Sequence, residues 1–181
     1  MNDIAKGTLA GFIATAPMTL AMAAMFHLLP RRQQYRLPPR QVTMRILGTP
    51  TVRQQTDERD RSNLTLMSHF AYGAACGAAY APLARWLRPP GATAGIAHGI
   101  AVWSGSYLGW LPALGVMTPA TQHPAGRNAL MIAAHVVWGA AAGALLERMM
   151  REEDDVASAR PESQAPVAQT QLQEQPIGQV H

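Results

Sequence analysis

The chain alternates long apolar stretches with short polar segments, and the apolar stretches carry no charged residue. Asp, Glu, Lys and Arg are absent from residues 7–30, 64–84, 91–126 and 128–146. Each stretch is about as long as the ~20 residues with which an α-helix crosses the hydrocarbon core of a bilayer, or longer. The pattern therefore predicts four transmembrane helices, at about residues 4–29, 64–87, 92–116 and 128–150.

The predicted fold is all-α: a polytopic membrane protein with a four-helix transmembrane domain over residues 1–150. The remaining residues, 151–181, begin acidic and become rich in Gln, Pro, Ser and Ala, a composition typical of a disordered tail. The mean hydropathy of the chain is only −0.03, because this tail and an Arg-rich loop at 30–63 dilute the apolar stretches. A soluble helical protein of this length would need amphipathic helices instead.

The first apolar stretch also has features of a signal peptide, since Lys6 precedes it and small residues follow. It is longer than the usual ~7–15 residues of a signal-peptide core, so we expect this helix to be retained, with cleavage as the alternative. In the loop that follows, the segment from Arg40 to Leu47 is predicted to form a short interfacial helix.

The net charge of +4 comes mainly from that loop, whose arginines fit a membrane surface better than a nucleic acid. The loop contains eight arginines and no lysine: Arg31, Arg32, Arg36, Arg40, Arg45, Arg53, Arg59 and Arg61. With Arg127, the two loops on this side carry nine basic residues, and six lie on the other side: Lys6, Arg85, Arg88, Arg148, Arg151 and Arg160. This difference favours a cytoplasmic first loop and outward-facing termini, although the opposite orientation stays open.

Glycines recur at four-residue spacing in every predicted helix. The pairs are Gly7 and Gly11, Gly73 and Gly77, Gly95 and Gly99, Gly105 and Gly109, and Gly139 and Gly143. Small residues at this spacing let helix backbones approach closely in a membrane. We therefore predict tight helix packing, either inside the bundle or with a second copy or another membrane protein.

One phrase occurs twice, as SHFAYGAACG from Ser68 and as AHVVWGAAAG from Ala134. His69 and His135 within it are expected at similar depth in two helices that run in the same direction. His27, His123, Arg127 and Asn128 are expected at the same membrane face, so these six residues form the candidate polar site. Buried histidines often serve packing through interhelical hydrogen bonds, but ionisable residues in a membrane are also candidates for binding a proton, metal or haem.

No catalytic residue or cofactor motif stands out. HExxH, CxxC, GxSxG and P-loop motifs are absent, and Cys76 is the only cysteine. We therefore expect no enzyme activity and no cofactor. The leading hypothesis is a structural or interaction protein packed through its glycines. The alternatives are a small-solute or proton transporter or channel with a His-lined vestibule, and a haem or metal carrier that uses His69 and His135 as ligands.

The segments YRLPPR and GSYLGWLPALGVMTPATQHPAGRNALMIAAHVVWG, the second from Gly105 to Gly139, resemble a family of uncharacterised bacterial inner-membrane proteins. That family is a domain of unknown function and is distantly similar to the YagU-like family. The resemblance covers about Gly7 to Met150. It implies a multi-pass location in the bacterial inner membrane and supplies no activity and no catalytic residue.

Overall fold

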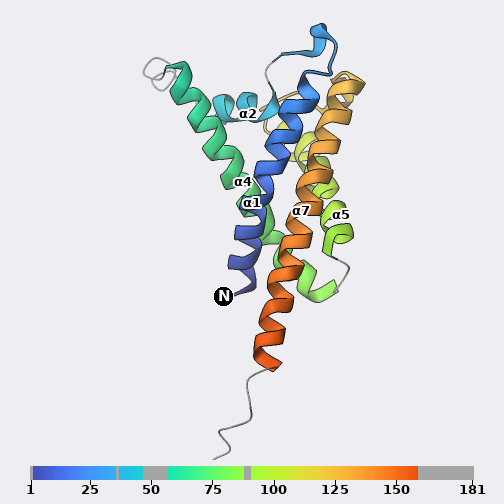
Figure 1. The fold of residues 1–181 in the computed structure, drawn as a ribbon. Coiled ribbons are helices and arrows are strands. Elements are labelled where there is room, and N and C mark those ends of the chain that lie inside the picture. Colours follow the sequence, from blue (N-terminus) through green and yellow to red (C-terminus); the bar gives the residue numbers. More distant parts are fainter. Residues whose placement is uncertain (1, 36, 47–56, 88–90, 159–181) are drawn as a thin grey trace, which may run out of the picture.

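The structure, a computed structural model, describes residues 2–35, 37–46, 57–87 and 91–158. Its four long helices are α1 (Asp3–Phe26), α4 (Glu58–Leu87), α5 (Gly91–Ser104) and α7 (Ala125–Ser158), and all regular structure in the described ranges is helical (Figure 1). Several predicted features lie outside these ranges: the turn at 88–90, the tail from 159, and residues Arg36, Leu47, Arg53, Arg88 and Arg160.

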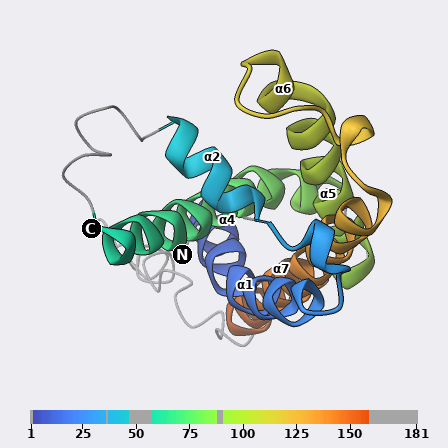
Figure 2. The same cartoon turned by 90° about the horizontal axis from the view of Figure 1, so that it is seen from above.

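Five shorter elements connect or extend the long helices: η1 (Arg31–Gln33), α2 (Pro38–Ile46), η2 (Gly105–Trp110), α6 (Leu111–Ala113) and η3 (Ala120–Gln122). α2 confirms the short helix that was predicted in the Arg-rich loop, beginning two residues earlier than expected. It packs against α4 and is seen beside that helix from above (Figure 2).

The long helices are arranged in the order α4, α1, α7, α5. α1 packs against both α4 and α7, α5 packs against α7, and α4 and α5 touch each other only slightly. α4 and α7 run in one direction, and α1 and α5 run in the other (Figure 1). The bundle therefore consists of two helix hairpins, α1 with α4 and α5 with α7, which meet along α1 and α7.

Glycines bring the two helices of each hairpin into backbone contact. A Cβ atom added to Gly11 would lie 2.9 Å from the Cα of Gly77, and one added to Gly95 would lie 2.8 Å from the Cα of Gly143. Real Cβ atoms do not approach so closely, so these positions accept only glycine without a shift of the backbone. Close approach at small residues replaces the hydrophobic drive that is missing in lipid.

The same pattern of contacts occurs in both hairpins. Gly11 lies against Gly73 and Gly77, as Gly95 lies against Gly139 and Gly143. Each copy of the repeated phrase therefore lies in the second helix of a hairpin, the first copy in α4 and the second in α7. Its glycines face the first helix of the same hairpin.

Gly105 and Gly109 do not pack against another described helix of the same chain, unlike the other predicted glycine pairs. Both glycines are exposed, and a Cβ added to either would meet nothing within 4 Å in the described structure. They lie in η2, a π-helical segment that interrupts the predicted third helix at 92–116. Gly109 has non-helical dihedral angles (φ −107°, ψ −105°), so the segment changes direction instead of continuing a straight helix.

Two predicted helix ends were wrong, because capping and ion pairs extend the helices into charged sequence. α4 begins at Glu58 rather than near residue 64, and the Asp57 carboxylate accepts a hydrogen bond from the Asp60 amide (2.8 Å). α7 continues to Ser158, although residues from 151 were expected to be disordered. Glu152 pairs with Arg148 one turn earlier (2.9 Å), which supports this extension.

Two of the helices are long and apolar enough to cross a membrane by length and composition, α1 over Asp3–Phe26 and α7 over Ala125–Val156. They lie next to each other at the centre of the bundle. Their side chains Ala14, Met18, Ala134 and Trp138 belong to one buried apolar cluster.

Candidate functional site

A cavity of about 400 Å³ lies between the two hairpins, where α4 and α5 diverge. Its walls come from α1, α4, α5, η2, α6 and α7, and α2 contributes Val42 and Ile46. The lining is largely apolar and includes Met18, Val102 and Leu111; none of the described lining residues is charged. His69 and His135 both line this cavity, so the structure brings the two predicted histidines to one site.

His135 is buried, with 6% of its surface exposed. Its Nδ1 donates a hydrogen bond to the carbonyl oxygen of Met131, one turn earlier on α7 (2.7 Å). A neutral imidazole has one N–H, and burial disfavours a charged ring. The Met131 carbonyl therefore holds that proton on Nδ1 and leaves Nε2 as a hydrogen-bond acceptor.

His69 occupies the corresponding position of α4 and is half-buried. Its Nε2 atom is buried and has no hydrogen-bond partner among the described residues. Both imidazoles line the same cavity, His69 from α4 and His135 from α7. No neighbouring carbonyl in the described structure fixes the tautomer of His69, so its ring can donate or accept.

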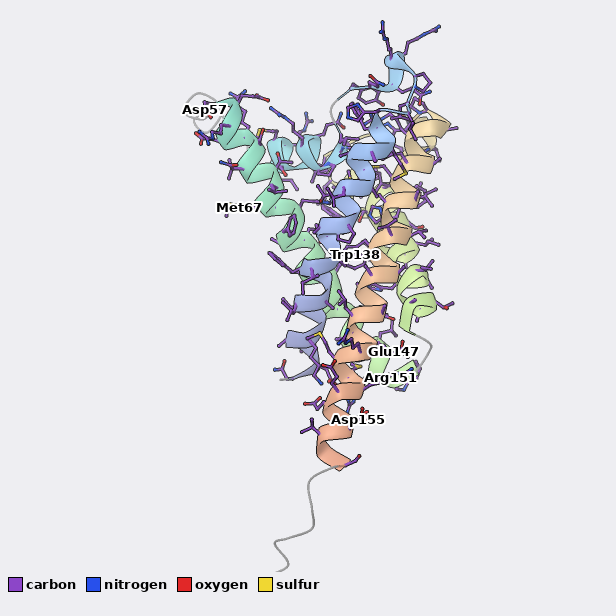
Figure 3. The ribbon with its side chains drawn as sticks, in the orientation of Figure 1. Asp57, Met67, Trp138, Glu147, Arg151 and Asp155 are labelled. Carbon is purple, nitrogen blue, oxygen red and sulfur yellow. The ribbon has the colours of Figure 1, made fainter. Side chains whose placement is uncertain are left out.

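The aromatic residue of each repeated phrase reaches the opposite hairpin. The Tyr72 hydroxyl lies 2.8 Å from the hydroxyl of Ser106 in η2. Trp138 donates its indole N–H to the carbonyl oxygen of Gly11 in α1 (3.1 Å), at the middle of the bundle in Figure 3. Both aromatic rings line the cavity, so they join the two hairpins at its walls.

The π-helical segment η2 supplies one side of the site. Ser106 and Tyr107 are buried there, and Trp110 and Leu111 complete that wall. Tyr107 meets the ring of His135 edge-on, with the ring centroids 6.0 Å apart. π-helical turns often occur at functional sites because they turn side chains away from a regular helix face.

Four residues of the predicted polar site lie outside the cavity. His27 is exposed at the end of α1, and His123 donates from Nε2 to the Thr118 carbonyl (3.1 Å). Arg127 is buried; it donates to the carbonyls of Gln33 (2.8 Å) and Tyr35 (3.0 Å). These two bonds attach the first loop to the beginning of α7.

Asn128, the residue after Arg127, has a similar connecting role. Its side-chain amide donates to the Ala120 carbonyl of η3 (2.7 Å). The guanidinium of Arg127 also lies over the Tyr35 ring, 3.6 Å from the ring centroid. Arg127 and Asn128 thus hold loops at one end of the bundle and do not contribute to the wall of the cavity.

Sequence reasoning missed two polar residues that pack between helices, the half-buried His98 and the buried Lys6. His98 stacks on Tyr80 (centroids 4.7 Å apart) and donates from Nε2 to the Cys76 carbonyl (3.1 Å). Its signal was present in the sequence, since it directly precedes Gly99 in a close-packed stripe. Lys6, counted above only as an outer basic residue, is 3% exposed and pairs with Glu153 at the lower end of α7.

The described residues contain no group of three or more His, Cys, Asp or Glu side chains that could hold a metal ion. His69 and His135 are the only two histidines at the cavity among them. The chemistry available there is hydrogen bonding by two imidazoles and several hydroxyl groups inside an apolar wall.

Comparison with known proteins gives a family match. A family described as "Protein of unknown function (DUF1440)" matches residues 18–144. This range contains the repeated phrases and nearly the whole cavity wall. No curated protein and no solved structure matches the chain.

Proposed function

The chain belongs to the DUF1440 family, which is described only as of unknown function, and we propose from its geometry that it is a four-span membrane protein that binds a small, largely apolar molecule between its two hairpins. The cavity of about 400 Å³ carries this proposal. Sites for small molecules usually measure about 300–1,000 Å³, with apolar walls and a few polar groups that orient the ligand.

The composition of the wall supports binding of an apolar body. Methionine, valine, leucine and aromatic side chains form most of it, and the polar groups are few: the two imidazoles, Tyr72 with Ser106, the Tyr107 hydroxyl, and short hydroxyl or thiol side chains. Apolar cavities of about 150 Å³ already bind benzene in engineered proteins. The cavity here has space for a larger molecule of the same character.

The position of the cavity supports the same function. It lies between two hairpins that repeat one contact pattern, and α4 and α5 scarcely touch there. Membrane transporters built from repeats place their substrate sites at the interface of the repeats. The cavity itself supports binding of the molecule. Its position between the hairpins also fits transport of that molecule.

Several features support four membrane crossings in addition to the hydropathy of α1 and α7. α4 is uncharged from residue 64 to residue 84, and its lower end reaches the beginning of α1, where Arg85 pairs with Asp3 (3.4 Å). Exposed apolar side chains occur on all the long helices: Leu9, Phe12, Ile13 and Leu20 on α1, Leu66, Met67 and Leu83 on α4, Ile100 on α5 and Val156 on α7. The expected multi-pass inner-membrane location is part of this proposal.

The glycine stripes have a structural role within one chain. Gly7, Gly11, Gly73, Gly77, Gly95, Gly99, Gly139 and Gly143 are all buried. Their partners are backbone and side-chain atoms of the same chain, so these stripes are already occupied within one copy. We propose that the stripes fix the hairpins and thereby keep the cavity open between them.

A carrier of a free metal ion has less support. Two histidines line the cavity, but the described residues offer no third His, Cys, Asp or Glu ligand beside them. Structural and catalytic metal sites generally use three or four protein ligands. We therefore place an organic ligand, rather than a metal ion, at the centre of the proposal.

Binding can be tested through the tryptophans of the cavity wall. Bromobenzene is a small apolar molecule whose bromine quenches tryptophan fluorescence on contact, and Trp110 and Trp138 both line the cavity. We expect saturable quenching in the purified full chain. Val102→Phe should remove the saturable part, because the larger ring occupies the space at the cavity wall.

Ile100→Phe is the matched control, since Ile100 is on the same helix but 41% exposed and is not a lining residue. It should keep the saturable quenching of the wild type. Equal quenching in both variants would mean that bromobenzene dissolves in the detergent or binds elsewhere, and the proposed function would then be wrong.

A further inference from the structure

The polar groups of the cavity differ in what they can offer a ligand. Nδ1 of His135 is already bonded to the Met131 carbonyl (2.7 Å), so only Nε2 is left, as an acceptor. Nε2 of His69 is buried without a partner among the described residues. The site therefore presents one fixed acceptor and one ring nitrogen that can serve as a donor.

A ligand that complements both rings needs a donor and an acceptor in the same small group. A hydroxyl group has both, because it carries one O–H and two lone pairs. An ether or a ketone oxygen can accept from His69 but leaves Nε2 of His135 unpaired. A buried polar atom left unpaired costs free energy, so such analogues should bind less tightly.

Tyr72 and Ser106 are less available for this role. Their hydroxyls bond to each other across the two hairpins (2.8 Å), which occupies one of their two O–H donors and one lone pair. The wall of the cavity is otherwise mostly apolar and uncharged, which disfavours an ionised ligand. The geometry thus selects a neutral molecule with an apolar body.

We infer that the ligand of this cavity is an apolar alcohol or phenol, whose O–H donates to Nε2 of His135 and whose oxygen accepts from the N–H of His69. This inference rests on the proposed function, because it names the chemical class of the molecule that the cavity binds. Each imidazole acts as a specificity-determining residue. The apolar wall supplies the greater part of the binding free energy.

A matched pair of probes tests the inference with the full chain at neutral pH. The probes are 4-bromophenol and 4-bromoanisole, which differ by a methyl group on the oxygen and both quench tryptophan. Their free concentrations are set by dialysis, so that unequal partition into detergent does not enter the affinity. We expect the phenol to bind about tenfold more tightly, the effect of roughly one hydrogen bond.

Three variants locate the preference. His135→Phe should remove it while 4-bromoanisole still binds, and His69→Phe should reduce it. His98→Phe is the control: His98 is a half-buried histidine between helices that does not line the cavity, so the preference should persist. If His135→Phe does not fold, the reduced preference expected in His69→Phe carries the test, and an unchanged preference in that variant would overturn the inference.

The outcomes separate the two proposals. Equal affinities for the two probes in the wild type, or a preference that persists in folded His135→Phe, would overturn the hydroxyl inference and leave the apolar binding site intact. A lack of saturable quenching by both probes and by bromobenzene would overturn the proposed function itself.

Discussion

The glycines of this chain show how strongly the surroundings of a residue decide its role. Gly95 and Gly105 lie in the same predicted helix, and each is followed by a second glycine four residues later. Gly95 lies against the backbone of α7, whereas Gly105 is exposed and has open space beside it. The four-residue spacing therefore identified candidates for close packing. It did not show that the chain turns away from α7 at η2, which leaves Gly105 and Gly109 without the contacts that Gly95 and Gly99 make.

Substitution of each glycine by alanine should reveal this difference. Gly95→Ala places a methyl group 2.8 Å from the Cα of Gly143, which forces the hairpin apart. We expect the free energy of unfolding to fall by about 1–3 kcal/mol, as for other overpacked sites. Gly105→Ala, the control, should stay within about 1 kcal/mol of the wild type. Thermal unfolding in detergent, followed by circular dichroism, measures both; equal losses would contradict the packing role.

Two tryptophans offer a second comparison of this kind. Trp138 donates its indole N–H to the Gly11 carbonyl (3.1 Å), while Nε1 of Trp103 is buried with no partner in the part of the chain that the structure describes. Both Trp→Phe substitutions remove an indole, but only Trp138→Phe loses a hydrogen bond. We therefore expect Trp138→Phe to destabilise the fold by about 1 kcal/mol more than Trp103→Phe. Comparable losses in unfolding measurements would show that the bond between α7 and α1 adds no stability.

The existence of the helices could be predicted from the sequence, but their ends could not. Uncharged stretches identified all four long helices, because a charged side chain is rare inside an apolar bundle. The helices nevertheless extend into charged sequence, at Glu58 in α4 and as far as Ser158 in α7. Partners that are distant in sequence, such as Lys6 for Glu153, stabilise these extensions, and spacing along one segment does not reveal them.

The lower end of α7 provides a test at this scale. Glu153 pairs with Lys6, whose side chain is 3% exposed, whereas Glu152 pairs with Arg148 on an open surface. Figure 3 shows this end of α7, with Glu147, Arg151 and Asp155 on successive turns. Glu153→Gln leaves a buried ammonium with the more distant Asp3 carboxylate (3.7 Å), so we expect a loss on the order of 2 kcal/mol.

Glu152→Gln is the control for that substitution. Exposed ion pairs contribute about 0–1 kcal/mol, so its melting temperature should change little. The comparison is made at low and at high salt, since salt screens the exposed pair more strongly than the buried one. If both variants lose the same stability, the contact between Lys6 and α7 does not hold the end of the bundle together.

The candidate site could be predicted only in part. His69 and His135 were identified because one phrase occurs twice at equal depth, and the structure places both at the cavity. The sequence-based prediction placed four more residues at the same end of the bundle: His27, His123, Arg127 and Asn128. In the structure the last three hydrogen-bond to carbonyl groups of the connecting segments, and His27 is exposed. The cavity itself depends on the divergence of α4 from α5 and on α2 beside it, which follow from packing between distant segments.

The four-span arrangement depends on whether α4 and α5 cross the membrane with α1 and α7. The side of the membrane on which Trp86 lies distinguishes the two possibilities, and this residue at the lower end of α4 is 79% exposed. In a Cys76→Ser background, four crossings predict that Trp86→Cys and Ser158→Cys react with an impermeant maleimide from one side of the membrane, and Gln122→Cys from the other. If only α1 and α7 cross, Trp86→Cys reacts from the same side as Gln122→Cys. The four-span proposal requires the first result, because Arg85 and Asp3 place the end of α4 beside the beginning of α1.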